Sequence, residues 1–132
     1  MKIQFSQKQF ANTPLAEQIK DLIQFCVPKT PRYRQGLLVK VMIYTRQDYP
    51  TRWRGNYRCA EQQGLYPSEI FRKDLVESVI TLKLGREVPV ETILYLIAHE
   101  VAHHITWIKD KRFGEKRADK LAQKIIDRYH RK

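Results

Sequence analysis

Two histidines four positions apart, with a glutamate directly after the first, occur in the segment His99-Glu100-Val101-Ala102-His103. On an α-helix these histidines lie on the same face, one turn apart, where both imidazoles can bind one metal ion. The pattern H-E-x-x-H is typical of helical zinc sites in which the glutamate is the general base toward a metal-bound water. The segment therefore predicts that His99 and His103 bind Zn²⁺, and that Glu100 is the catalytic residue of a metal-dependent peptidase.

Apolar residues around this segment indicate the helix that it requires. One apolar stripe follows intervals of four, four, four and three positions: Ile93, Ile97, Val101, Ile105 and Ile108. His99 and His103 lie off this stripe, and Pro89 suits the first turn of a helix. We therefore expect a helix from about Pro89 to Ile108. The alternative interpretation is that the histidines and the glutamate merely line the polar side of a core helix.

A catalytic zinc ion usually has three protein ligands, so a third residue must come from elsewhere in the chain. His104 is about 100° around the helix from His103 and points in another direction. His130 is 27 residues after His103, and Asp110 lies in the turn expected after the helix. None of these positions suits a third ligand.

Glu115 is the better candidate for the third ligand. It precedes Ala118 and Ala122 by three and seven positions, so we expect its carboxylate on the buried side of the last helix, beside small residues that leave room for a metal. Asp119, four positions later, can accept a hydrogen bond from the free nitrogen of a ligating histidine. Two other interpretations stay open: Glu115 as an acidic residue favoured at a helix N-terminus, and Asp119 as an exposed partner of basic neighbours.

The last helix, expected from Glu115 onward, is amphipathic. Its apolar positions follow steps of three, one, three, one and three: Ala118, Leu121, Ala122, Ile125, Ile126 and Tyr129. Its other face is basic and carries Lys116, Arg117, Lys120, Lys124 and Arg128.

The upstream sequence predicts one further helix and a small sheet. Thr13 can cap a helix that has Pro14 at its first position and that Pro28 closes. Residues 29–36 are expected to form a basic loop. Segments rich in β-branched and aromatic residues predict strands at 37–45, 53–60 and 79–84, with a further short strand near 69–72. The order α-β-β-β-α-α indicates a single α+β domain over residues 1–132.

The two motifs together resemble those of gluzincins, zinc peptidases with H-E-x-x-H on one helix and a glutamate on the next. The segment GEKRADKLA, residues 114–122, resembles the E-x-x-A-[DN]-x-x-A signature of minigluzincins and of metallopeptidase domains of the ImmA/IrrE type. The resemblance covers mainly residues 79–126. It implies a zincin-like single domain with an N-terminal helix, a small three-stranded sheet, an active-site helix and a C-terminal glutamate helix. It also implies His99, His103 and Glu115 as metal ligands.

In such folds, an edge strand before the metal helix pairs with extended substrate, a role that residues 79–84 or 54–60 would have here. SprT-like proteases offer a more distant resemblance, through a basic surface and a strand before the metal helix. Their third ligand is a downstream histidine, whereas this sequence has no histidine between His104 and His130. It also lacks the four-cysteine zinc ribbon that SprT-like proteins often carry.

The composition favours a folded cytoplasmic protein with no membrane partner. Hydrophobic residues make up 42% of the 132 residues, enough for a modest core. No apolar run approaches the length that spans a bilayer, and residues 1–5 lack the apolar segment of a signal peptide. Cys26 and Cys59 form neither a disulfide framework nor a metal-type pair, so we expect both to be reduced.

Positive charge is concentrated in two regions of this chain, whose net charge is +11. Residues 29–58 contain eight basic and one acidic residue, a net charge of +7, and residues 109–132 contain ten and four, a net charge of +6. Such regions can bind nucleic acid, and a solvated basic surface is the alternative. The first region also has aromatic residues of the kind that stack on bases: Tyr33, Tyr44, Tyr49, Trp53 and Tyr57.

Two functional hypotheses follow. The first is a zinc-dependent endopeptidase that acts on a peptide or protein, with Tyr57, Tyr66 or Tyr95 as candidates to stabilise the oxyanion. The second is a DNA-associated or regulatory module that keeps the zincin fold with little or no proteolysis. A purely structural zinc ion would normally have four protein ligands, which argues against that role. Neither the substrate nor the oligomeric state follows from the sequence.

Overall fold

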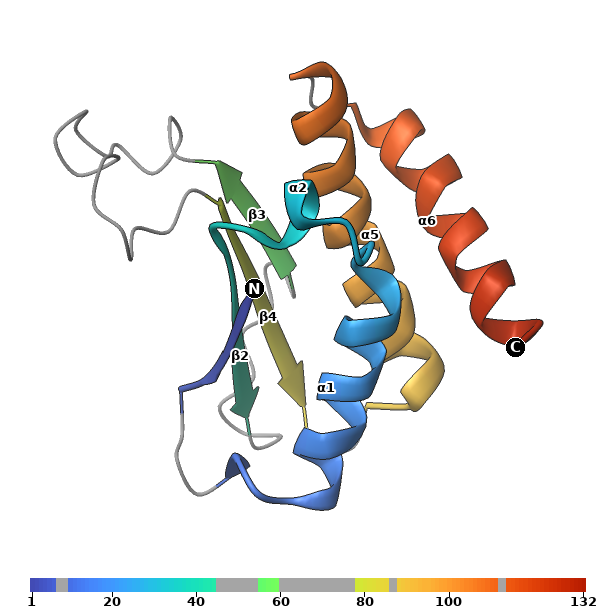
Figure 1. Ribbon diagram of the computed structural model, residues 1–132. Helices are drawn as coiled ribbons and strands as arrows, with labels where there is room; N and C mark the ends of the chain where they lie inside the picture. Colours follow the sequence, from blue (N-terminus) through green and yellow to red (C-terminus); the bar gives the residue numbers. More distant parts are fainter. Residues whose placement is uncertain (7–9, 45–54, 60–77, 86–87, 112–113) are drawn as a thin grey trace, which may run out of the picture.

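The helices pack against a mixed sheet in the computed structural model, which describes residues 1–6, 10–44, 55–59, 78–85, 88–111 and 114–132 (Figure 1). The sheet has four strands among these residues, in the spatial order β1 (Lys2–Phe5), β2 (Leu37–Tyr44), β4 (Ser78–Gly85) and β3 (Gly55–Cys59). β1, β2 and β4 run parallel, and β3 pairs antiparallel with β4. β1 and β3 are therefore the two edge strands of the described sheet.

The alternation of side chains along the two central strands places one row of apolar residues in the core. The register of β2 and β4 pairs Val39 with Ile80, Val41 with Leu82, and Ile43 with Leu84. All six side chains are buried, whereas Lys40, which lies between two of them in β2, is exposed. Since successive residues of a strand point to opposite faces, these six residues mark the face of the sheet that lies against the core.

Helix α1 (Pro14–Cys26) provides part of the connection between the parallel strands β1 and β2, which a tight turn cannot join. It begins as expected, because the Thr13 hydroxyl accepts a hydrogen bond from the Ala16 N–H at 3.2 Å and Pro14 is the first helical residue. Its buried face shows helical spacing and consists of Ala16, Ile19, Leu22, Ile23 and Cys26.

The short helix α2 (Pro31–Arg34) fastens the end of α1. The Arg34 guanidinium donates hydrogen bonds to the carbonyl oxygens of Gln24, Val27 and Pro28 at 3.0, 2.9 and 3.0 Å. The last carbonyl groups of a helix have no partner within the helix, and Gln24 is in the last turn of α1, so Arg34 satisfies one of these groups together with two carbonyl groups just after the helix.

Two long helices, α5 (Val90–Asp110) and α6 (Glu115–His130), form an antiparallel hairpin. Lys111 ends α5 in the left-handed conformation, with φ of 54°, which turns the chain back toward α6. At the far end of the hairpin, His130 Nε2 lies 3.0 Å from a carboxylate oxygen of Glu91. The hairpin is therefore held both by its turn and by a polar contact between its two ends.

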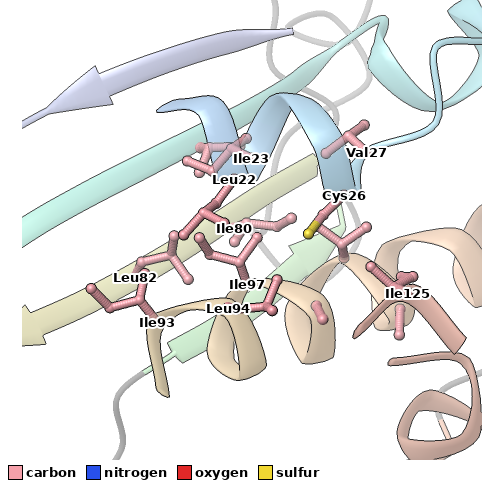
Figure 2. Close-up of a cluster of buried hydrophobic side chains, with 14 of the residues drawn as sticks. Leu22, Ile23, Cys26, Val27, Ile80, Leu82, Ile93, Leu94, Ile97 and Ile125 are labelled. Carbon is pink, nitrogen blue, oxygen red and sulfur yellow. The ribbon is translucent and has the colours of Figure 1, made fainter. Parts of the chain in front are cut away.

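The hydrophobic core joins the sheet to these helices. Figure 2 shows side chains from α1, β4 and α5 that meet in one cluster: Leu22, Ile23, Ile80, Leu82, Ile93, Leu94 and Ile97. Ile125 brings α6 into the same cluster. Cys26 is a free thiol in this core, where burial raises its pKa to about 12, so it stays protonated at neutral pH.

The α+β class is confirmed, and the strands expected at 37–45, 53–60 and 79–84 correspond to β2, β3 and β4. The structure differs from the sequence expectations in three places. β1 joins the three expected strands as a fourth, the basic loop expected at 29–36 contains α2, and Pro89 precedes α5 as its N-cap residue. The short strand expected near 69–72 lies outside the described residues. No described helix is long and apolar enough to cross a membrane.

Candidate metal centre

Two imidazoles of α5 face each other across one helical turn. His99 Nε2 and His103 Nε2 are 3.2 Å apart, and their ring planes are nearly perpendicular, at 88°. The direction of both rings is set by the opposite side of α5, where Ile97 and Val101 are buried in the core. Two ring nitrogens at this distance need a proton or a cation between them, because facing lone pairs repel each other.

Glu115, the first residue of α6, completes the group. Its Oε2 lies 3.3 Å from His99 Nε2, and its Oε1 lies 3.2 Å from His103 Nε2. Ala118 and Ala122 are buried as expected, and their small side chains let α6 approach α5 closely. The expected burial of Glu115 itself is wrong, because 74% of its side chain is exposed. At the first position of α6 no preceding helical turn covers the side chain, so the carboxylate reaches the histidines from the solvent side.

These positions fit one metal ion. The candidate ligand atoms of His99, His103 and Glu115 all lie within 4.8 Å of one another. A tetrahedral ion with bonds of about 2.0–2.1 Å separates its ligand atoms by about 3.3 Å. The contacts between these side chains measure 3.2, 3.3 and 3.2 Å, close to that separation, with Oε2 of Glu115 facing His99 and Oε1 facing His103. The three side chains can therefore hold a metal ion, and imidazole and carboxylate donors are common ligands of divalent transition metals.

Asp119, one turn after Glu115, contacts the other nitrogen of His99. Its Oδ1 lies 3.2 Å from His99 Nδ1, although the contact lacks the alignment of a hydrogen bond. A proton on Nδ1, directed toward this carboxylate, would leave the lone pair of Nε2 facing His103 and Glu115. Asp119 therefore occupies the position expected for a residue that orients a metal ligand.

Glu100 is buried in α5 next to His99 in sequence. Burial and, to a smaller extent, the negative charge of Glu115 together raise the pKa of Glu100 to about 7. Burial also lowers the pKa of His103, although Glu115 opposes that shift. A carboxyl group that titrates near neutrality can both accept and donate protons, and a neutral imidazole offers its lone pair to a metal.

Comparison with family models, with curated proteins and with solved structures finds no match to this chain. The candidate centre therefore rests on the positions of side chains from α5 and α6. Its residues come from two segments that the hairpin brings together, and the sequence motifs had placed each of them on the helix where it is found.

The two remaining histidines lie away from this group. His104 is buried, and its Nε2 donates a hydrogen bond to the Tyr33 carbonyl oxygen at 2.6 Å, which ties α5 to α2. Burial lowers the pKa of His104, which favours the neutral ring. His130 pairs with Glu91 at the other end of the hairpin. The expectation that neither histidine is the third ligand agrees with these positions.

Tyr95, one turn before His99, lies next to the candidate metal centre. The sequence suggested it as a residue that could stabilise the oxyanion. Its ring stacks on the His99 imidazole with centroids 6.0 Å apart and 23° between the planes. Tyr95 is 49% exposed, and among the described residues no other large hydrophobic side chain is exposed. The interval of four between Tyr95 and His99 was the available signal for this stacking. The side chain of Tyr57 and all of Tyr66 lie outside the described residues.

Proposed function

We propose that this chain is a zinc-dependent endopeptidase of the gluzincin type. The observation that carries the proposal is the convergence of His99, His103 and Glu115 on one point, with the buried Glu100 beside them. Two histidines and one glutamate are a known ligand set of catalytic zinc, which keeps a fourth position for water or substrate. A glutamate in the third position favours the gluzincin resemblance over the SprT-like one.

The residues of the site suit peptide hydrolysis. Zinc, when bound, would supply Lewis acidity and bring the pKa of a water molecule to about 7. Glu100 would take the proton from the attacking water and pass it to the leaving amine, two roles that its pKa near 7 supports. Asp119 would keep the His99 ring in one orientation. Tyr95 would offer an exposed aromatic surface to a substrate side chain.

The position of β3 supports an extended peptide as substrate. β4 lies between β2 and β3, so of the two strands considered from the sequence, β3 is the one with an open edge in the described sheet. β3 also packs against α5, the helix that carries the histidines. A peptide that paired with this edge as an additional strand would therefore run beside the helix of the metal centre.

The substitution Glu100→Gln tests this function. We expect zinc-loaded Glu100→Gln protein to hydrolyse an unfolded protein substrate at least about a hundredfold more slowly than the wild type, because general base catalysis contributes on the order of 10²–10⁴. Its zinc content should not change, since Glu100 is not a ligand. Glu91→Gln, an exposed position of the same helix, is the matched control and should keep full activity. Equal hydrolysis by Glu100→Gln and wild type would exclude this mechanism.

A further inference from the structure

The outward side of α6 carries a row of basic side chains, which we term the basic ridge: Lys116, Lys120, Lys124, Arg128 and Arg131. All five are exposed. The first four follow one another at intervals of four, and each interval advances along the helix by about 6 Å. None of the five forms an ion pair with another residue in the described ranges of the chain. Arg128 donates a hydrogen bond to the Phe25 carbonyl oxygen at 3.4 Å and lies over the Phe25 ring. Lys116, Lys120, Lys124 and Arg131 are therefore the side chains of the ridge that can reach an external partner, while Arg128 adds its charge beside them.

The acidic residues of α6 leave the basic ridge almost uncompensated. Glu115 and Asp119 are directed toward the histidines of α5. Asp127, seven residues after Lys120, lies on the ridge side of the helix, and its carboxylate accepts a hydrogen bond from Gln123 at 2.9 Å. The basic ridge thus presents five positive charges against the single negative charge of Asp127 on this part of the described surface.

The other basic region of the sequence uses its described arginines differently. Arg34 is engaged with the carbonyl oxygens at the end of α1, and Arg32 donates a hydrogen bond to the Ile108 carbonyl oxygen at 3.0 Å. Tyr33 between them is only 8% exposed, so it has no free face for a base. The expected role of Tyr33 in stacking is therefore wrong, because its ring belongs to the core. Tyr49 and Trp53, with the side chains of Tyr44 and Tyr57, lie outside the described residues.

The chemistry of the basic ridge favours a nucleic acid over a membrane surface. A helix that binds a bilayer needs apolar residues to insert below the headgroups. The apolar face of α6, formed by Ala118, Ala122, Ile125 and Ile126, is already buried in the protein. What remains outside is a linear array of cations, which suits the regular phosphates of a nucleic-acid backbone and carries no means of reading bases.

We propose that the basic ridge of α6 binds the phosphate backbone of nucleic acid without sequence preference. Its cations belong to the same helix as Glu115 and Asp119, but they point away from the metal centre. Nucleic-acid binding therefore does not depend on the peptidase function, and either property can fail without the other. Because the contacts are electrostatic, the affinity should fall steeply as salt is raised.

The experiment measures binding of the full chain to a fluorescent DNA duplex of about 20 base pairs, at several salt concentrations between about 50 and 200 mM. Each phosphate contact contributes about 0.9 to the slope of log affinity against log salt. Lys120→Gln/Lys124→Gln should therefore reduce the slope by about 1.8 and weaken binding at low salt about tenfold or more. Asp127→Asn should strengthen binding, since it removes the negative charge from the basic ridge.

The matched control is Lys2→Gln/Lys40→Gln, which removes the same charge from exposed positions of β1 and β2, away from α6 (Figure 1). It should leave the slope unchanged. An equal loss in both double variants would overturn the proposal, because net charge alone would then explain binding. Absence of binding at low salt would also overturn it. So would binding of anionic lipid vesicles, with the same dependence on Lys120 and Lys124, in the absence of DNA binding.

Discussion

The two helices of the hairpin contribute to the candidate metal centre in opposite ways. α5 supplies His99 and His103 from a helix whose other side is packed in the core, and only 10% of the His103 side chain is exposed. α6 supplies Glu115 from its first position, where 74% of the side chain is exposed. A ligand lost from the buried side leaves a gap among packed groups, whereas water can replace a ligand lost from the exposed side. We therefore expect metal affinity to depend more on α5 than on α6.

His103→Ala should have the largest effect on metal binding. A structural zinc site gains about 10–16 kcal/mol from its four ligands, so one buried ligand accounts for roughly 3 kcal/mol, or about a hundredfold in affinity. Competition with a chromophoric chelator measures this loss. His130→Ala is the matched control, because His130 pairs with Glu91 outside the centre, and it should bind zinc as the wild type does. Similar affinities of the two variants would contradict the role of α5.

Asp119→Asn should weaken metal binding less, because Asp119 acts through the His99 ring. Residues that orient a metal ligand contribute on the order of 10–100-fold to affinity, and the exposure of Asp119 places it at the lower end, about tenfold. The same chelator competition measures the effect. A loss as large as that of His103→Ala would show that Asp119 binds the metal directly. An unchanged affinity would show that its contact with His99 has no effect on binding.

His104→Leu should have the smallest effect on metal affinity, although His104 follows His103 directly in the sequence. It removes the donor to the buried Tyr33 carbonyl group, which costs about 1–3 kcal/mol of folding stability. Urea unfolding of the metal-free protein should show this loss, while zinc affinity stays at the wild-type value. His104→Gln keeps an N–H donor and should recover part of the stability. A marked loss of zinc affinity in His104→Leu would contradict the claim that His104, unlike His103, has no part in metal binding.

Much of the centre could be predicted because its signals are local. The interval between His99 and His103 and the apolar stripe of α5 both follow from helical periodicity. Glu115 could be placed from Ala118 and Ala122, because small residues at that spacing predict close packing of α6. The exposure of Glu115 could not be predicted, since it depends on where the turn at Lys111 leaves the first residue of α6.

The missed features depend on distant partners. β1 is a four-residue strand, too short to recognise before β2 is known to pair with it. Tyr33 lies in a segment that is basic by composition, yet its carbonyl group meets His104, 71 positions later. Arg34 likewise shows only its charge in the sequence, while the structure uses it to close α1. Local pattern predicted which helices carry the candidate metal ligands, whereas long-range contacts decide which charged residues are engaged within the protein.

The most direct test of the account is a zinc titration of wild type, Glu115→Gln and Glu17→Gln. Glu17 is an exposed glutamate of α1, remote in sequence from the centre, and serves as the matched control. We predict one zinc ion per wild-type and Glu17→Gln chain, with equal affinity, and a loss on the order of 10–100-fold for Glu115→Gln, which keeps both histidines. Equal zinc affinity in wild type and Glu115→Gln would contradict the claim that α5 and α6 share one metal ion.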